Sequence, residues 1–171
     1  MLKQYFSIFI KSLLTLLAGA AVGFVFFYFF KNASVFIIDK FKILQGIFGI
    51  REYQEGMSFN YVLAAIFLGN LLSTIGYFTL GFLKASLPIS FITGVFMVIF
   101  LFTGTIRHGT SIPVEVILLS SIEMFYRVTA LTTGEYINKN RFKNKAIPIT
   151  SIVIIFIMFI SAVFYELYQI F

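Results

Sequence analysis

Four long stretches of the chain contain no charged side chain: residues 12–30, 56–83, 85–106 and 146–165. An α-helix needs about 20 mostly apolar residues to cross the hydrocarbon core of a membrane. Only 12% of the residues are charged, whereas a soluble domain has about 25%. The chain therefore has too few charges to cover a surface in water. We predict an all-α, polytopic transmembrane helical bundle that forms one domain, residues 1–171.

We expect five membrane spans in this bundle. Four of them coincide with the uncharged stretches, at about residues 12–30, 59–83, 87–106 and 146–168. A fifth span, at about residues 112–133, is apolar in outline but carries Glu115, Glu123 and Arg127. In the alternative, only four helices span and the region after His108 dips into the bilayer. The first stretch exceeds the apolar region of a cleaved signal peptide, about 7–15 residues, so we expect it to be retained.

Residues 35–50 are too polar for a span, but they are predicted to form a helix that lies in the membrane interface. One side of this helix would carry Ile37, Phe41, Leu44 and Phe48. The other side would carry Asp39, Lys42, Gln45 and Gly49. The helix is either an amphipathic connector that caps the bundle or a surface on which a partner or a peptide docks.

The loop before the last span is strongly basic, with Lys139, Arg141, Lys143 and Lys145. Lysine and arginine favour the cytoplasmic side of a membrane, so we place this loop in the cytoplasm. Alternation through five spans then puts Lys3, Lys11 and Lys84 on the same side. The prediction is a multi-pass protein of the cell membrane with a cytoplasmic N-terminus and an extracytoplasmic C-terminus.

Small residues at a spacing of four indicate where helices pack closely in lipid. The first span has such a pair in Gly19 and Gly23. The second span has a longer stripe, made of Ala65, Gly69, Ser73 and Gly76. We predict that both stripes are packing seams. Asn70, beside the second stripe, is expected to form a hydrogen bond across a helix interface.

The span at residues 112–133 carries ionisable residues that a membrane interior tolerates only with a partner. An ionisable residue deep in a span costs about 2.5–3.5 kcal/mol on insertion scales and usually faces the bundle interior. Glu123 and Arg127 are four residues apart with the acid first, which favours a helical ion pair. We predict a buried Glu123–Arg127 pair, which is either architectural or part of a working polar site.

A second polar group lies at the entrance of the same span. Pro113 suits the first turn of a helix. Glu115 follows it near the outer interface, shortly after Arg107 and His108. We expect the arginine, the histidine and the glutamate to orient a polar turn or to meet an anionic partner.

No pattern in the sequence indicates an enzyme, a cofactor site or a metal site. One histidine cannot supply both ligands of an HExxH zinc site, and cysteine is absent. There is no GxSxG or Walker motif. Glu115 and Glu123 would lie two helical turns apart, too far to share acid–base work. The net charge of +6 comes from dispersed bases, which fits loops near anionic lipid rather than nucleic acid.

These polar residues and the second span resemble the stage II sporulation protein M family. The matching residues are His108, Gly109, Pro113, Glu115 and Arg127, with Asn70, Gly76 and Gly81 in the second span. The last span, "ISAVFYELYQIF" with Glu166, is similar as well, and the resemblance covers roughly residues 59–171. The chain departs from the family pattern in three ways. Its acid and proline are interchanged, its helix "LLSSIEMFY" is bulkier, and Glu123 is added.

The resemblance implies a membrane protein without enzymatic activity. Short members of the family look like membrane proteins encoded with circular bacteriocins, which act in maturation, export or self-immunity beside a separate ATPase. The hypothesis is a membrane subunit that handles a hydrophobic peptide in the lipid bilayer. Its partners would be an ATP-binding subunit, other membrane subunits or further copies of itself. The alternatives are a scaffold that recruits cell-wall peptidoglycan hydrolases and a small transporter that uses Glu123 and Arg127 as a polar relay.

Overall fold

The structure is a computed structural model that describes residues 2–47, 56–109, 111–141 and 143–171. The helices are α1 (Leu2–Phe29), α2 (Lys31–Ile47), α3 (Phe59–Phe82), α4 (Ser86–His108), α5 (Val114–Asn140) and α6 (Ala146–Ile170). The described residues contain no strand. The prediction of an all-α helical bundle is confirmed.

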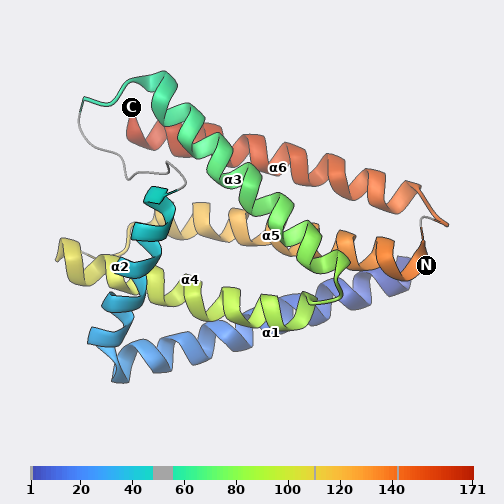
Figure 1. Cartoon of the computed structure of the whole chain (residues 1–171), viewed down its shortest axis with the longest axis horizontal. Coiled ribbons are helices and arrows are strands. Elements are labelled where there is room, and N and C mark those ends of the chain that lie inside the picture. The colour runs from blue at the N-terminus through green and yellow to red at the C-terminus, as the bar shows by residue number, and fades with distance from the viewer. Residues whose placement is uncertain (1, 48–55, 110, 142) are drawn as a thin grey trace.

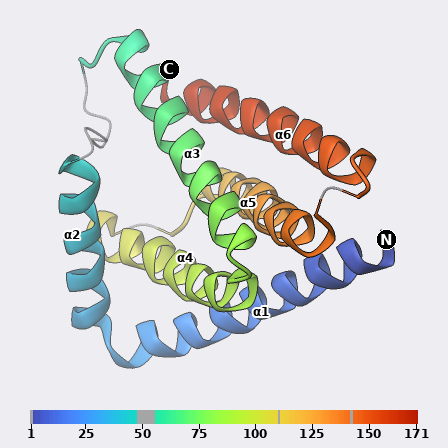
Figure 2. The ribbon, with the colours of Figure 1, turned by 45° about the vertical axis from the view of Figure 1, so that its right-hand side comes forward.

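Five long helices run back and forth between two ends of the molecule (Figure 1). One end holds the N-terminus, the turn from α3 to α4 and the connection from α5 to α6. The opposite end holds the connection from α4 to α5 and the C-terminus. The short helix α2 lies across this second end, at a steep angle to the others (Figure 2).

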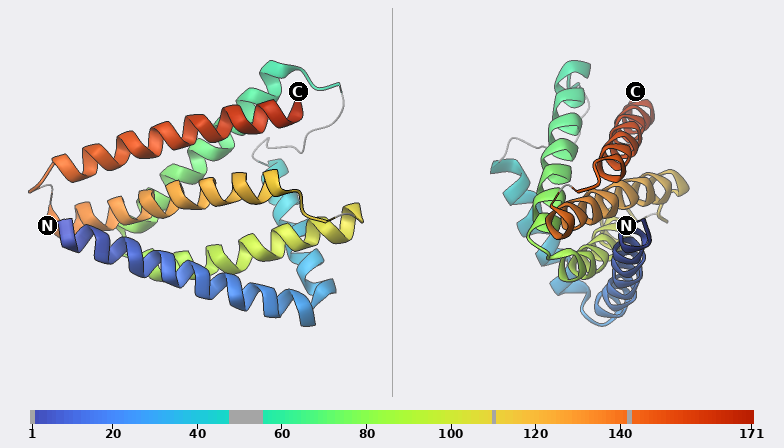
Figure 3. Two further views of the ribbon diagram at one scale, coloured as in Figure 1. Left: turned by 180° about the vertical axis from the view of Figure 1, so that it is seen from behind. Right: turned by 90° about the vertical axis from the view of Figure 1, so that its right-hand side faces the viewer.

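Four helices are long and apolar enough to cross a membrane: α1, α3, α4 up to Arg107, and α6. The more polar α5 does not meet that standard of composition, yet it connects the two ends from the middle of the bundle (Figure 3). Two helices extend beyond the predicted spans, since α1 begins at Leu2, before residue 12, and α5 continues to Asn140, after residue 133. Charged residues end an apolar window but do not end a helix.

Glycines bring α1 and α4 into backbone contact. A Cβ atom on Gly23 would lie 2.6 Å from the carbonyl oxygen of Val95, and one on Gly19 would overlap the backbone of Phe91. From the other side, Gly94 leaves no room for a Cβ beside Leu16. The predicted Gly19–Gly23 seam is confirmed, and its partner is α4.

Helices α3 and α5 cross equally closely at two glycines outside the predicted stripe, Gly81 and Gly134. A Cβ on Gly81 would overlap the backbone of Leu131, and one on Gly134 would overlap that of Phe78. Gly76, by contrast, has no atom near the place of a Cβ. The predicted seam is therefore wrong at Gly76, because a spacing of four marks one helix face but not the point at which another helix crosses it.

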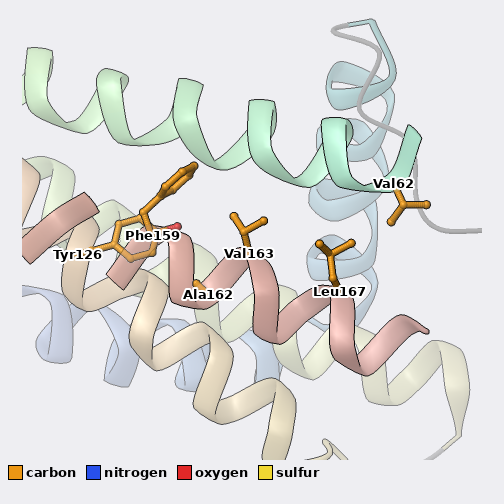
Figure 4. Packing of buried hydrophobic residues seen from close by; sticks show 6 residues of the cluster. All are labelled: Val62, Tyr126, Phe159, Ala162, Val163 and Leu167. Carbon is orange, nitrogen blue, oxygen red and sulfur yellow. The ribbon is translucent and has the colours of Figure 1, made fainter. Parts of the chain in front are cut away.

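The main core lies where α3, α5 and α6 meet. Its buried residues are Val62, Tyr126, Phe159, Ala162, Val163 and Leu167, and Figure 4 shows the α6 side chains directed toward α3 and α5. The second half of α5 is the most enclosed segment, since residues 128–137 are all buried. This helix therefore forms the centre of the bundle.

Helix α2 confirms a helix in the predicted interfacial segment, although it begins at Lys31 rather than at residue 35. The predicted apolar side of this helix is only partly turned toward the bundle. Ser34 and Ile38 are buried, whereas Ile37 and Leu44 are exposed. Phe41 does face the bundle, with its ring 4.6 Å from that of Phe96 on α4. Phe48 and Gly49, which were also assigned to α2, lie outside the described residues.

Candidate functional site

The two halves of α5 differ sharply in burial. Val114 is 74% exposed and Leu118 is 49% exposed, while the side chains from Val128 to Ile137 are enclosed by α1, α3 and α6. Glu123, Tyr126 and Arg127 lie at the boundary between the two halves. Glu123 and Arg127 thus lie where the exposed face of this helix meets the core.

The predicted ion pair is present at this boundary. Arg127 Nη2 lies 3.1 Å from Glu123 Oε2, and the two side chains are only 15% and 17% exposed. The guanidinium is also 5.8 Å from the centre of the Tyr126 ring. The pair is therefore largely shielded from the surroundings of the bundle, as the sequence predicts.

Asn70 joins α3 to this pair. Its side-chain oxygen accepts hydrogen bonds from Arg127 Nη2 at 2.9 Å and from the Tyr126 hydroxyl at 3.2 Å. The prediction that Asn70 hydrogen-bonds across a helix interface is confirmed. Arg127 Nε is buried and makes no hydrogen bond within the described part of the chain.

Glu166 brings α6 into the same polar cluster. It is half-buried and interacts electrostatically with both Glu123 and Arg127. The ionised cluster therefore sets two carboxylates against one guanidinium. Tyr126 is fully buried, and its ring packs edge-on against Phe159 at 6.3 Å, which fixes the hydroxyl beside Asn70. We call Asn70, Glu123, Tyr126, Arg127 and Glu166 the intramembrane polar cluster.

This arrangement offers two kinds of chemistry inside a membrane. The uncompensated carboxylate can accept a proton, or it can bind a cation. Hydrogen bonds and charge pairs of this kind also fix the register of three helices. Within the described residues, no group of histidine and acidic side chains is arranged to hold a metal ion.

The residues predicted at the entrance of this span do not form one group. Arg107 pairs with Asp39 of α2, so it ties α2 to α4 rather than meeting Glu115, which is exposed in the first turn of α5. Pro113 is the N-cap of α5. Gly109 caps α4 with a φ of 65°, a left-handed conformation that glycine adopts without strain. The side chain of His108 lies outside the described residues.

The basic residues near the other end have unequal surroundings. Lys139 pairs with Glu135, one turn earlier on α5, whereas Arg141, Lys143 and Lys145 are exposed. Sequence reasoning missed the Glu135–Lys139 pair, although a spacing of four with the acid first is the signal that identified Glu123 and Arg127. The bond of Tyr126 to Asn70 and the pairing of Asp39 with Arg107 join distant helices, and no pattern along the chain indicates these partners.

The chain matches no known family model, no curated protein and no solved structure. The resemblance to the stage II sporulation protein M family thus stays a prediction. Three residues singled out for that resemblance, Asn70, Arg127 and Glu166, belong to the intramembrane polar cluster.

Proposed function

We propose that this protein is a non-enzymatic membrane subunit that handles a hydrophobic, bacteriocin-like peptide during maturation, export or self-protection. One observation carries the proposal: the first half of α5 is exposed although the helix is too polar to count as a span by composition. Lipid is a poor cover for such a helix, because polar groups facing hydrocarbon are costly. A peptide or another membrane subunit would cover it better.

The exposed face of α5 mixes apolar and polar groups in a way that suits a peptide partner. Val114, Ile117 and Leu118 offer apolar contacts, while Glu115 and Ser121 are also exposed. The exposed hydrogen-bonding groups of this face are Glu115 and Ser121, because the Nε–H of Arg127 is buried. In lipid, helices associate through close packing and interhelical hydrogen bonds, and this face provides groups for both.

A photoreactive residue at Leu118 tests this proposal. We expect irradiation of cells to yield a covalent product with a small apolar peptide or with a membrane subunit encoded nearby. Ile157, which is 58% exposed on α6, is the matched control and should capture lipid. A product with a cell-wall hydrolase at Leu118 would favour the scaffold alternative, and capture of lipid alone at both positions would contradict the proposal.

The orientation belongs to the same proposal, with the N-terminus in the cytoplasm beside an ATP-binding subunit. The turn from α3 to α4, with Lys84, and the end of α5 with its connection to α6, which hold Lys139, Arg141, Lys143 and Lys145, lie at the end of the bundle that also holds the N-terminus. Such a cluster of bases favours the cytoplasm. Single cysteines at Asn140 and at Asn32 should therefore react with an impermeant thiol reagent from opposite sides. Labelling of Asn140→Cys in intact cells would show that the protein has the opposite orientation.

A small transporter is the second candidate. The intramembrane polar cluster favours it, because ionisable residues within a bundle often mark proton or ion pathways. Glu166→Gln, which keeps the Glu123–Arg127 pair, separates the two functions. If the wild type carries a proton-dependent flux in vesicles and the variant loses it, transport is supported. If neither protein carries a flux and the variant still handles the peptide, the subunit role is supported.

A further inference from the structure

An open pocket lies between the C-terminal ends of α3 and α5. Its walls are Phe82, Lys84, Ile137, Asn138, Lys139 and Arg141. Ile137 forms a buried apolar wall and Phe82 adds an exposed ring, while three bases and one amide surround them. The pocket lies at the end of the bundle that holds the N-terminus, where the apolar helices give way to connections.

The backbone holds this pocket in a fixed shape. Gly81 and Gly134 bring α3 and α5 into contact just before both helices end. The Lys84 N–H then donates to the Gly81 carbonyl at 2.8 Å, and the Arg141 N–H donates to the Ile137 carbonyl at 2.8 Å. The two basic residues thus lie at the ends of two helices whose backbones are in contact.

Both of these basic residues have a left-handed backbone, with φ values of 63° at Lys84 and 46° at Arg141. Among the described residues, they are the only ones other than glycine with a positive φ. Glycine or asparagine occupies such a position after a helix with less strain. A base near a helix C-terminus is favourable in itself, but it gains that benefit anywhere in the last turn. Strained backbone positions cluster at binding sites, so the strain at Lys84 and Arg141 indicates that their side chains bind a ligand.

We propose that Lys84 and Arg141 bind the phosphate group of an anionic phospholipid. A guanidinium donates to phosphate through two parallel hydrogen bonds, and an ammonium adds a compact charge. Asn138 offers a further donor, while Lys139 is already engaged by Glu135. Phe82 and Ile137 would contact the glycerol and acyl portion, which inorganic phosphate lacks, so the ligand is a lipid rather than a free anion. Basic pockets between membrane helices recognise anionic headgroups by this chemistry.

The site would hold an annular lipid in place against the α3–α5 crossing. It does not depend on peptide handling, because it lies at the opposite end of α5 from the exposed face that carries Leu118. Failure of the peptide proposal would therefore leave this site unaffected.

Native mass spectrometry of the detergent-purified protein with added phosphatidylglycerol or phosphatidylcholine tests the site. We expect the wild type to retain phosphatidylglycerol in preference to phosphatidylcholine. Inorganic phosphate at the same concentration should not displace the bound phosphatidylglycerol. Lys84→Asn with Arg141→Asn should weaken retention about twenty-five-fold, since each base near an anionic headgroup contributes about fivefold. The variant should melt at the same or a higher temperature, because asparagine tolerates a left-handed backbone.

Two further variants make the outcome decisive. Lys31→Asn with Lys40→Asn removes the same charge from the opposite end and should leave retention unchanged. Lys84→Arg with Arg141→Lys keeps the charge and should retain most of the lipid. Equal retention of both lipids by the wild type would overturn the proposal, as would unchanged retention after the asparagine substitutions or displacement by inorganic phosphate.

Discussion

The α1–α4 pair and the α3–α5–α6 group are both built on close contact, yet they hold their helices together differently. Between α1 and α4 the contact is made by Gly19, Gly23 and Gly94 against backbone. At the α3–α5–α6 group, the glycine contact of Gly81 and Gly134 is joined by the intramembrane polar cluster. One region is held by shape alone, and the other by shape together with directed hydrogen bonds and charge.

The difference indicates where specificity is needed. Close packing stabilises a helix pair in lipid without any ionisable group, as α1 and α4 demonstrate. A second region that accepts the cost of burying charge therefore gains something beyond stability, either a fixed register or a working polar site. Substitutions that act on one region and spare the other separate these two contributions.

The largest effect is expected at the glycine seam. Gly19→Ile with Gly23→Ile should lower the free energy of unfolding by about 6 kcal/mol, because overpacking costs about 1–3 kcal/mol per site and here meets rigid backbone. Thermal melting in detergent, followed by circular dichroism, measures the change. Gly76→Ile is the matched control, since its Cβ meets open space, and it should change stability by less than about 0.5 kcal/mol. Equal melting temperatures for the two variants would show that α1 and α4 do not touch at this seam.

A somewhat smaller effect is expected from the ion pair. Arg127→Met alone should cost about 3–5 kcal/mol, because it leaves Glu123 and Glu166 without a counter-charge. Glu123→Gln alone should cost less, because Glu166 remains near Arg127, and the double substitution should recover most of the loss caused by Arg127→Met. Accumulation in the membrane and the melting temperature in detergent measure the loss of stability in the single variants and its recovery in the double variant. If the stable double variant keeps its activity, the pair is architectural; if it is stable but inactive, the pair belongs to a working site. Wild-type stability in both single variants would contradict the burial of the pair.

The sequence predicts the components of this comparison better than their partners. Uncharged windows located four of the helices, since hydropathy alone selects segments that suit lipid. Spacing within one helix identified Gly19 with Gly23 and Glu123 with Arg127, because a periodicity of 3.6 residues places them on one face.

Contacts between helices were not predictable in the same way. Gly81 rather than Gly76 meets α5, and Ile38 rather than Ile37 faces the bundle. These choices depend on crossing angles and on the rotation of each helix, which are set by packing against neighbours distant in the chain. The pairing of Arg107 with Asp39 has the same origin.

The smallest expected effect concerns single polar groups in the two regions. Asn70→Leu leaves the Tyr126 hydroxyl and one Arg127 donor without their acceptor, and an unsatisfied buried group costs about 1–3 kcal/mol. In the α1–α4 region, Thr103 is buried on α4 with a hydroxyl that has no hydrogen-bond partner in the part of the chain that the structure describes. Thr103→Val should therefore leave the melting temperature unchanged or raise it. If Thr103→Val destabilised the protein as much as Asn70→Leu, buried polar groups would contribute equally to stability in both regions. The proposed difference between the α1–α4 pair and the intramembrane polar cluster would then be wrong.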